Sequence, residues 1–328
     1  MSDRMIRLLD WLGRLPWPLA HGLGYLLGLA LGALPLKGSR IADANLAVCL
    51  PHLPAWRRRL LRLRSFGHIG CIMLESRRIW RADVAGIERL VHRVQGEAVL
   101  REAIERGRGV LVVTPHLGGW EVLNQYLASR YPLTTLYRPQ RGALEDHAAA
   151  GRRRLGARLV PTSAGGVRAL RRALARGELV GMLPDQDISR GGAAGLFVRY
   201  FGQQAHTPVL PARLAASSGA AVVMAVARRR LGRGFDLNFS PVGGVSEAAS
   251  AAAGALALNA ALERVIVALP AQYWWSYPRF RRRPPGAAPI YGRDERRLSR
   301  AAAAPADSAA PRCAAPESGG TPADPSYE

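Results

Sequence analysis

The stretch GVLVVTPHLGGWE, Gly109 to Glu121, gives the clearest indication of the fold class. It contains a continuous apolar run, Val110–Val113, which is typical of a strand that is buried on both faces of a parallel sheet. Pro115 ends this run, so the sequence predicts that His116 lies at the carboxyl end of a strand. In open α/β sheets this edge is where ligands bind.

His116 and Glu121 are the first candidates for chemistry. On one continuous helix their five-residue offset would place them about 140° apart, so they can face each other only if the chain turns between them. The pair Gly118-Gly119 supplies that turn. A histidine oriented by a carboxylate can take a proton from a hydroxyl, which makes the pair a candidate dyad. The alternative is that both residues are structural or lie at the surface.

A second short apolar run, ELVGML at residues 178–183, is also followed by a proline. It predicts another strand, with Asp185 and Asp187 at the same sheet edge as His116 if the two strands are parallel. Two carboxylates could bind a divalent ion, but a metal site usually needs more ligands, and no His or Cys is near them in the sequence. We therefore expect no metal, and we expect Asp185 to pair with an arginine.

Several further segments resemble one family when they are taken in order. They are GRGVLVVTPHLGGWE at 107–121, Tyr137-Arg138-Pro139, R-x-R-x-G at 152–156, the PDQD-containing segment 177–220, QYWW at 272–275 and RPPG at 283–286. The chain resembles the late acyltransferases of lipid A biosynthesis, within the lysophospholipid acyltransferase superfamily, over roughly residues 40–286.

The resemblance implies a fold and a reaction. The fold is α/β, with a central, mostly parallel sheet flanked by helices, as in glycerolipid acyltransferases, and an N-terminal membrane-anchoring helix. The reaction is transfer of a fatty acyl chain from acyl carrier protein to a hydroxyl of a lipid A precursor of the Kdo-lipid IVA type. His116 and Glu121 would be catalytic, with no cofactor. No Ser or Cys stands in a nucleophile-elbow pattern, so a covalent acyl-enzyme is not expected.

Arginines are candidates for binding the phosphates of such an acceptor, because guanidinium groups bind phosphate in a bidentate manner. The candidates are Arg138, Arg152 and Arg154, and the resemblance also implies a functional role for Asp185 and for an arginine of the R-x-R segment. Whether that arginine is Arg152 or Arg154 stays open.

The chain departs from the family pattern at Arg199, His206 and Tyr277-Pro278. Pro115 stands where the phospholipid-making branch of the superfamily usually has asparagine, which argues against a lysophosphatidate acyltransferase. Two other functions stay open. One is acyl transfer to another acceptor, such as a glycolipid or an ornithine lipid, and the other is non-enzymatic membrane binding on the same fold.

The chain is strongly basic, with a formal net charge of +22 over 328 residues. This charge favours acidic partners, namely anionic lipid head groups, nucleic acid or an acidic carrier protein. No zinc-finger, RNP or helix-turn-helix pattern is present, so nucleic acid is not expected as a partner. The three cysteines fit no metal or redox spacing.

The composition predicts a membrane anchor at 1–40, a catalytic domain at 41–292 and a disordered Ala/Pro/Ser-rich tail at 293–328. The apolar segment Leu19 to Leu36 could span a membrane, lie in its plane or form a buried core helix. Gly24, Gly28 and Gly32 predict a face for close helix packing. The family resemblance implies the inner membrane, with the catalytic domain on the cytoplasmic side.

Overall fold

The computed structural model describes residues 11, 15–138, 142–187 and 195–292. The expected tail, residues 293–328, lies outside the described residues, as do residues 1–10 and 12–14 of the expected anchor.

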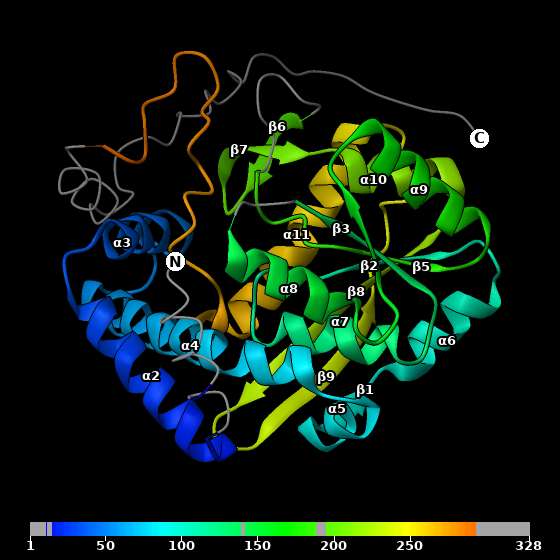
Figure 1. Cartoon of the computed structure of the whole chain (residues 1–328). Helices are drawn as coiled ribbons and strands as arrows, with labels where there is room; N and C mark the ends of the chain where they lie inside the picture. The colour runs from blue at the N-terminus through cyan, green and yellow to red at the C-terminus, as the bar shows by residue number, and fades with distance from the viewer. Residues whose placement is uncertain (1–10, 12–14, 139–141, 188–194, 293–328) are drawn as a thin grey trace, which may run out of the picture.

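A seven-stranded sheet forms the centre of the molecule, in the order β1-β9-β8-β2-β5-β3-β4 (Figure 1). The five strands from β8 to β4 are parallel, β9 is antiparallel to β8, and β1 is parallel to β9. The strands are β1 (Val91–Gln95), β2 (Val110–Val113), β3 (Leu133–Tyr137), β4 (Arg158–Pro161), β5 (Leu179–Met182), β8 (Ala221–Arg230) and β9 (Gly234–Pro241). The predicted mostly parallel sheet is therefore confirmed. A separate antiparallel hairpin consists of β6 (Gly195–Tyr200) and β7 (Gln203–Pro208).

Helices cover both faces of the sheet. Alternate residues of the buried strands point to opposite faces, and on each face they pack with helices to form an apolar core. Leu111 and Val113 of β2 lie in one core, and Val110 and Val112 lie in the other. The first core includes α9 (Ala164–Ala175), α10 (Leu210–Ser218) and α11 (Ala251–Ala268), and the second includes α5 (Val84–Leu90), α6 (Glu97–Glu105) and α7 (Trp120–Ala128). The predicted α/β architecture with flanking helices is confirmed.

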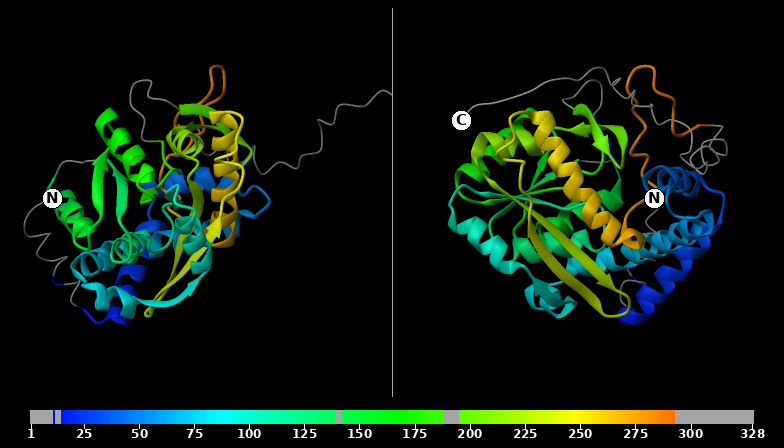
Figure 2. Two further views of the ribbon diagram at one scale, coloured as in Figure 1. Left: turned by 90° about the vertical axis from the view of Figure 1, so that its right-hand side faces the viewer. Right: turned by 180° about the vertical axis from the view of Figure 1, so that it is seen from behind.

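The N-terminal helices form a layer beside this sheet (Figures 1 and 2). They are α2 (Trp17–Ala33), α3 (Lys37–Cys49) and α4 (Ala55–Arg81). Helix α4 contacts α8 (Ala143–Arg153). Glycines allow α2 and α4 to approach closely: a Cβ at Gly24 would lie 2.7 Å from the carbonyl oxygen of Gly70, and a Cβ at Gly28 would lie 2.0 Å from that of Phe66. The predicted glycine packing face is therefore confirmed.

The opposite face of α2 carries a row of exposed leucines, here called the leucine row, which consists of Leu19, Leu26, Leu27 and Leu31. The exposed Leu34 follows the end of the helix. Among the described helices, α11 has the length and hydropathy to cross a membrane, but its residues Leu258, Leu262 and Ile266 belong to the core. The 17-residue α2 meets the same criterion only together with α3, to which it is bent by 81°. The structure thus shows that α2 exposes an apolar face at the surface.

Candidate active site

Two strand ends come together at the expected edge of the sheet. The parallel strands β2 and β5 pair Val113 with Met182, and the amide of Thr114 donates to the carbonyl of Met182 at 3.1 Å. His116 and Asp185 each follow their paired strand residue by three positions, so they arrive at the same edge. The prediction that these two residues share one sheet edge is confirmed.

Asp185 orients the ring of His116. The Nδ1 atom of His116 lies 2.8 Å from Asp185 Oδ1, and the backbone amide of His116 donates to Asp185 Oδ2 at 3.1 Å. Burial alone would raise the pKa of the 1% exposed Asp185, but the charge and hydrogen bonds of His116 outweigh burial and lower it. Asp185 is therefore ionised and accepts a hydrogen bond from the protonated Nδ1 of His116. Nε2 is left as the basic nitrogen of the ring.

Glu121 does not bind His116. Its carboxylate accepts hydrogen bonds from Arg152 Nε at 3.1 and 3.2 Å, from an Arg152 terminal nitrogen at 2.5 Å, and from Trp80 Nε1 at 2.8 Å. The expected partners are thus exchanged. We expected Asp185 to pair with an arginine, but it binds His116. We expected Glu121 to bind His116, but it binds Arg152.

The direction of α7 explains the exchange. Glu121 lies in the first turn of this helix and is 5% exposed, on the side that packs against α4 and α8. Arg152 reaches it from the last turn of α8. Burial alone would lower the pKa of Arg152, but the Glu121 carboxylate raises it above its usual value, so the pair stays charged.

Two tryptophans flank the His116 ring. The ring centroid lies 5.3 Å from Trp120 and 6.4 Å from Trp274, and these two tryptophans are 5.5 Å apart. The amide of Trp274 also donates to the carbonyl of His116 at 3.0 Å. The sequence alone did not predict Trp274 at the site, although its segment QYWW is among those that resemble the family.

His116 opens onto a pocket of about 620 Å³ that is formed by α4, α7, α8 and the loops after β3 and β5. Apolar side chains form much of the wall, including Met73, Leu136, Leu159 and Leu183. Of the three arginines expected to bind phosphate, Arg138 and Arg152 line this pocket. Arg154 does not line it and lies instead in the wall of a second pocket.

Asp187 turns away from Asp185 and toward a different histidine. It lies 3.0 Å from His206 Nδ1 and 3.5 Å from Arg282, and its backbone carbonyl accepts a hydrogen bond from the Tyr277 hydroxyl at 2.7 Å. His206 and Tyr277 are two of the positions at which the sequence departs from the family pattern, and they meet here. The two carboxylates therefore serve separate contacts.

The loop from His116 to Gly119 is held by its own backbone amides. Leu117 donates to Pro115 at 2.7 Å, Gly118 to Gln272 at 3.1 Å and Gly119 to Ala227 at 2.8 Å. Because the His116 amide is bound to Asp185, each of the four amides already has an acceptor. Any donor to a reacting carbonyl oxygen must therefore come from another part of the pocket.

A His–Asp pair at the carboxyl edge of a mostly parallel sheet, beside a partly apolar pocket, is an arrangement that can supply a general base in an α/β enzyme. The family model for bacterial lipid A biosynthesis acyltransferase matches residues 5–282, and the chain belongs to this family. The protein is therefore an acyltransferase.

Two relatives cover most of the chain, and a third covers about half of it. The lipid A biosynthesis lauroyltransferase of Escherichia coli is 29% identical over 86% of this chain and 94% of its own length. The lipid A biosynthesis palmitoleoyltransferase of the same organism is 28% identical over 85% and 90%. The phosphatidylinositol mannoside acyltransferase of Mycobacterium tuberculosis is 30% identical, over 47% of this chain and 52% of its own.

Proposed function

We propose that this protein transfers a fatty acyl chain from the thioester of acyl carrier protein to a hydroxyl of a lipid A precursor of the Kdo-lipid IVA type. The observation that carries the proposal is the His116–Asp185 hydrogen bond of 2.8 Å beside a pocket of about 620 Å³. The names and coverage of the two Escherichia coli relatives support the choice of acceptor.

The transfer is direct. Nε2 of His116 takes the proton of the acceptor hydroxyl, and the oxygen attacks the thioester carbonyl carbon while Asp185 stabilises the imidazolium. The tetrahedral intermediate then collapses, the C–S bond breaks, and the thiol of the carrier leaves with the proton that the imidazolium returns. General-base catalysis of this kind contributes roughly 10²–10⁴-fold to the rate.

Glu121 acts as a positioning residue in this proposal. Its carboxylate fixes Arg152 and Trp80 in the pocket wall. Arg138 and Arg152 are the cations of this pocket that we assign to the acceptor phosphates or to the developing oxyanion. No metal and no cofactor takes part.

The leucine row of α2 is the membrane-facing surface in this proposal, lying in the plane of the inner membrane with the catalytic domain on the cytoplasmic side. A lipid acceptor enters the pocket from that membrane, while the acidic acyl carrier protein approaches the strongly basic chain from the cytoplasm.

The test is an assay of detergent-solubilised protein with radiolabelled lauroyl-acyl carrier protein and Kdo-bearing lipid IVA. Wild type is expected to form a more highly acylated lipid, and His116→Ala is expected to form none. The exposed His52 provides the matched control, because His52→Ala removes a ring outside the site and leaves turnover unchanged. Turnover by His116→Ala would refute the proposed base.

A different glycolipid acceptor is the second candidate, because the phosphatidylinositol mannoside acyltransferase is also a relative. The same base can activate a hydroxyl on any lipid that fits the pocket. If wild type acylates a phosphatidylinositol mannoside and leaves Kdo-lipid IVA unchanged, this second acceptor class is correct.

A further inference from the structure

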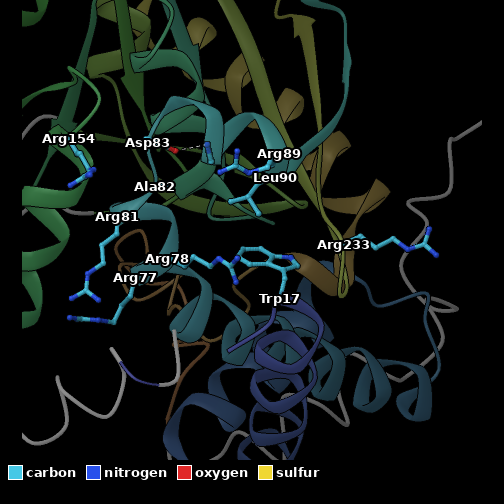
Figure 3. A pocket seen from close by; sticks show the side chains of 11 residues that line it. Trp17, Arg77, Arg78, Arg81, Ala82, Asp83, Arg89, Leu90, Arg154 and Arg233 are labelled. Atoms are coloured by element: carbon cyan, nitrogen blue, oxygen red, sulfur yellow. Dashed lines mark hydrogen bonds between the residues drawn. The ribbon is translucent and has the colours of Figure 1, made fainter. Parts of the chain in front are cut away.

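A second pocket, of about 740 Å³, is lined by residues of α4 and shares Arg77 with the first pocket; Figure 3 shows the side chains that line it. Its wall is strongly basic, and its arginines come from four separate parts of the chain: α4, α5, the turn after α8 and the turn between β8 and β9. They are Arg77, Arg78, Arg81, Arg89, Arg154 and Arg233.

The charge of this arginine pocket is largely of one sign. Asp83 is the one carboxylate among its lining residues, and Asp83 Oδ1 already accepts a hydrogen bond of 2.7 Å from the Gly86 amide at the start of α5. Low-dielectric walls around like charges concentrate a positive potential within such a concavity. The pocket therefore suits a compact anion of the size of a phosphorylated head group.

A tryptophan fixes the position of the pocket relative to α2. Trp17, the first residue of α2, forms part of the wall and is 8% exposed. The Arg78 guanidinium lies 5.4 Å from the centre of the Trp17 ring, and Arg78 also donates to the carbonyl of Leu15 at 3.1 Å (Figure 3). Basic and tryptophan side chains together are typical of protein surfaces at the head-group level of a membrane.

The exposed leucines of α2 begin at the same place. Leu19 lies within one helical turn of Trp17 and is 60% exposed, and the leucine row of α2 continues from it to Leu31. A helix that lies in a membrane plane with these leucines in the acyl region would hold its first turn, and the arginine pocket beside it, at the level of the phosphates.

We propose that the arginine pocket binds the phosphate head group of an anionic glycerophospholipid of the surrounding bilayer. Arg77 is 4% exposed and lines both pockets, so a head group bound here lies against the wall of the catalytic pocket. The bound lipid holds the mouth of the catalytic pocket at the membrane surface. The site goes beyond the proposed acyl transfer, because its ligand is not consumed.

The test compares binding of the full-length protein to phosphatidylcholine vesicles with and without phosphatidylglycerol, by co-sedimentation. The variant is Arg78→Gln/Arg81→Gln/Arg89→Gln, in which three exposed arginines are neutralised. Each basic side chain near an anionic surface strengthens binding by about fivefold. We expect the variant to bind phosphatidylglycerol vesicles roughly a hundredfold more weakly and to bind phosphatidylcholine vesicles as wild type does.

The matched control removes the same charge elsewhere. Arg168→Gln/Arg171→Gln/Arg172→Gln alters the exposed face of α9, which covers the other face of the sheet. Vesicle binding by this control should stay close to that of wild type. An equal loss in both variants would overturn the proposal, because it would show an effect of net charge alone.

An activity assay in detergent micelles without anionic phospholipid tests whether the arginine pocket binds a substrate instead of a bilayer lipid. We expect the α4–α5 variant to keep wild-type kcat and KM there. A raised KM for acyl carrier thioester or for the phosphorylated acceptor, with unchanged vesicle binding, would overturn the proposal and assign the pocket to that substrate. Failure of acyl transfer by wild type itself would refute the proposed function and leave the vesicle result valid.

Discussion

Asp185 binds His116 through both of its carboxylate oxygens, one to the imidazole Nδ1 at 2.8 Å and one to the backbone amide at 3.1 Å. The two-point contact fixes both the ring and the loop that carries it. A single buried carboxylate thereby determines the tautomer of His116, the proposed base, and the orientation of its ring.

Asp185→Asn is expected to lower kcat by roughly 10²–10⁴-fold, because the amide keeps the shape of the side chain but no longer stabilises an imidazolium. The measurement is single-turnover acyl transfer, with circular dichroism as the check on folding. Asp187→Asn is the matched control, since Asp187 contacts His206. A folded Asp185→Asn enzyme with wild-type kcat would show that Asp185 is not needed to orient the base.

Glu121→Ala is expected to act mainly through stability. The change leaves Arg152 without its buried carboxylate, and breaking a buried ion pair in this way costs about 3 kcal/mol. The free energy of unfolding by urea should fall by about this amount in Glu121→Ala, and Glu121→Ala/Arg152→Ala should fall by less than the sum of the two single changes. Additive losses would show that the two residues do not interact.

The sequence was sufficient to predict where the loops after β2 and β5 meet. A buried apolar run followed by proline occurs before both His116 and Asp185, and in a parallel sheet this pattern fixes the edge at which each residue lies. It could not fix the partner of each carboxylate. Glu121 lies close to His116 in sequence, but Arg152 on α8 and Trp80 on α4 compete for it through tertiary packing.

The aromatic wall was also beyond sequence reasoning. Trp274 reaches the His116 ring because the segment after α11 returns to the loop that carries His116. There Leu117 pairs with Tyr273 in an isolated antiparallel bridge, and the amide of Gly118 donates to the carbonyl of Gln272. Only the three-dimensional path of the chain brings these parts together. The glycine spacing of α2, by contrast, predicted its packing face, because helical periodicity is a local property.

Gly28→Ala is expected to separate α2 from α4, because the new Cβ would lie 2.0 Å from the carbonyl oxygen of Phe66. Overpacking of this kind costs about 1–3 kcal/mol. Gly22→Ala in the same helix is the matched control: a Cβ there meets nothing within 4 Å, so it should be neutral or stabilise by up to about 1 kcal/mol. Thermal unfolding in detergent measures both, and equal effects would contradict the proposed close contact.

Glu75 makes stability depend on pH. Its carboxylate binds His21 Nε2 at 2.9 Å and the Arg229 guanidinium, which also donates to the carbonyl of Gly118 in the catalytic loop at 2.8 Å. Burial alone would raise the pKa of Glu75, but Arg229 and His21 together lower it from 4.5 to about 2. The ionised, buried carboxylate of Glu75 and the Arg229 guanidinium therefore connect the N-terminal helices to the loop that carries His116.

A carboxylate whose pKa is lowered by folding stabilises the folded state above its unfolded pKa, and this contribution is lost as the pH falls through its folded pKa. The contribution of Glu75 should thus be complete near neutrality and should disappear between about pH 4.5 and 2. Urea unfolding across this range should show wild type losing more stability than Glu75→Gln, which starts less stable at pH 7. Glu88→Gln, at an exposed ion pair with Arg130, is the control and should follow wild type. Parallel curves for wild type and Glu75→Gln would show that Glu75 titrates alike in the folded and unfolded chains.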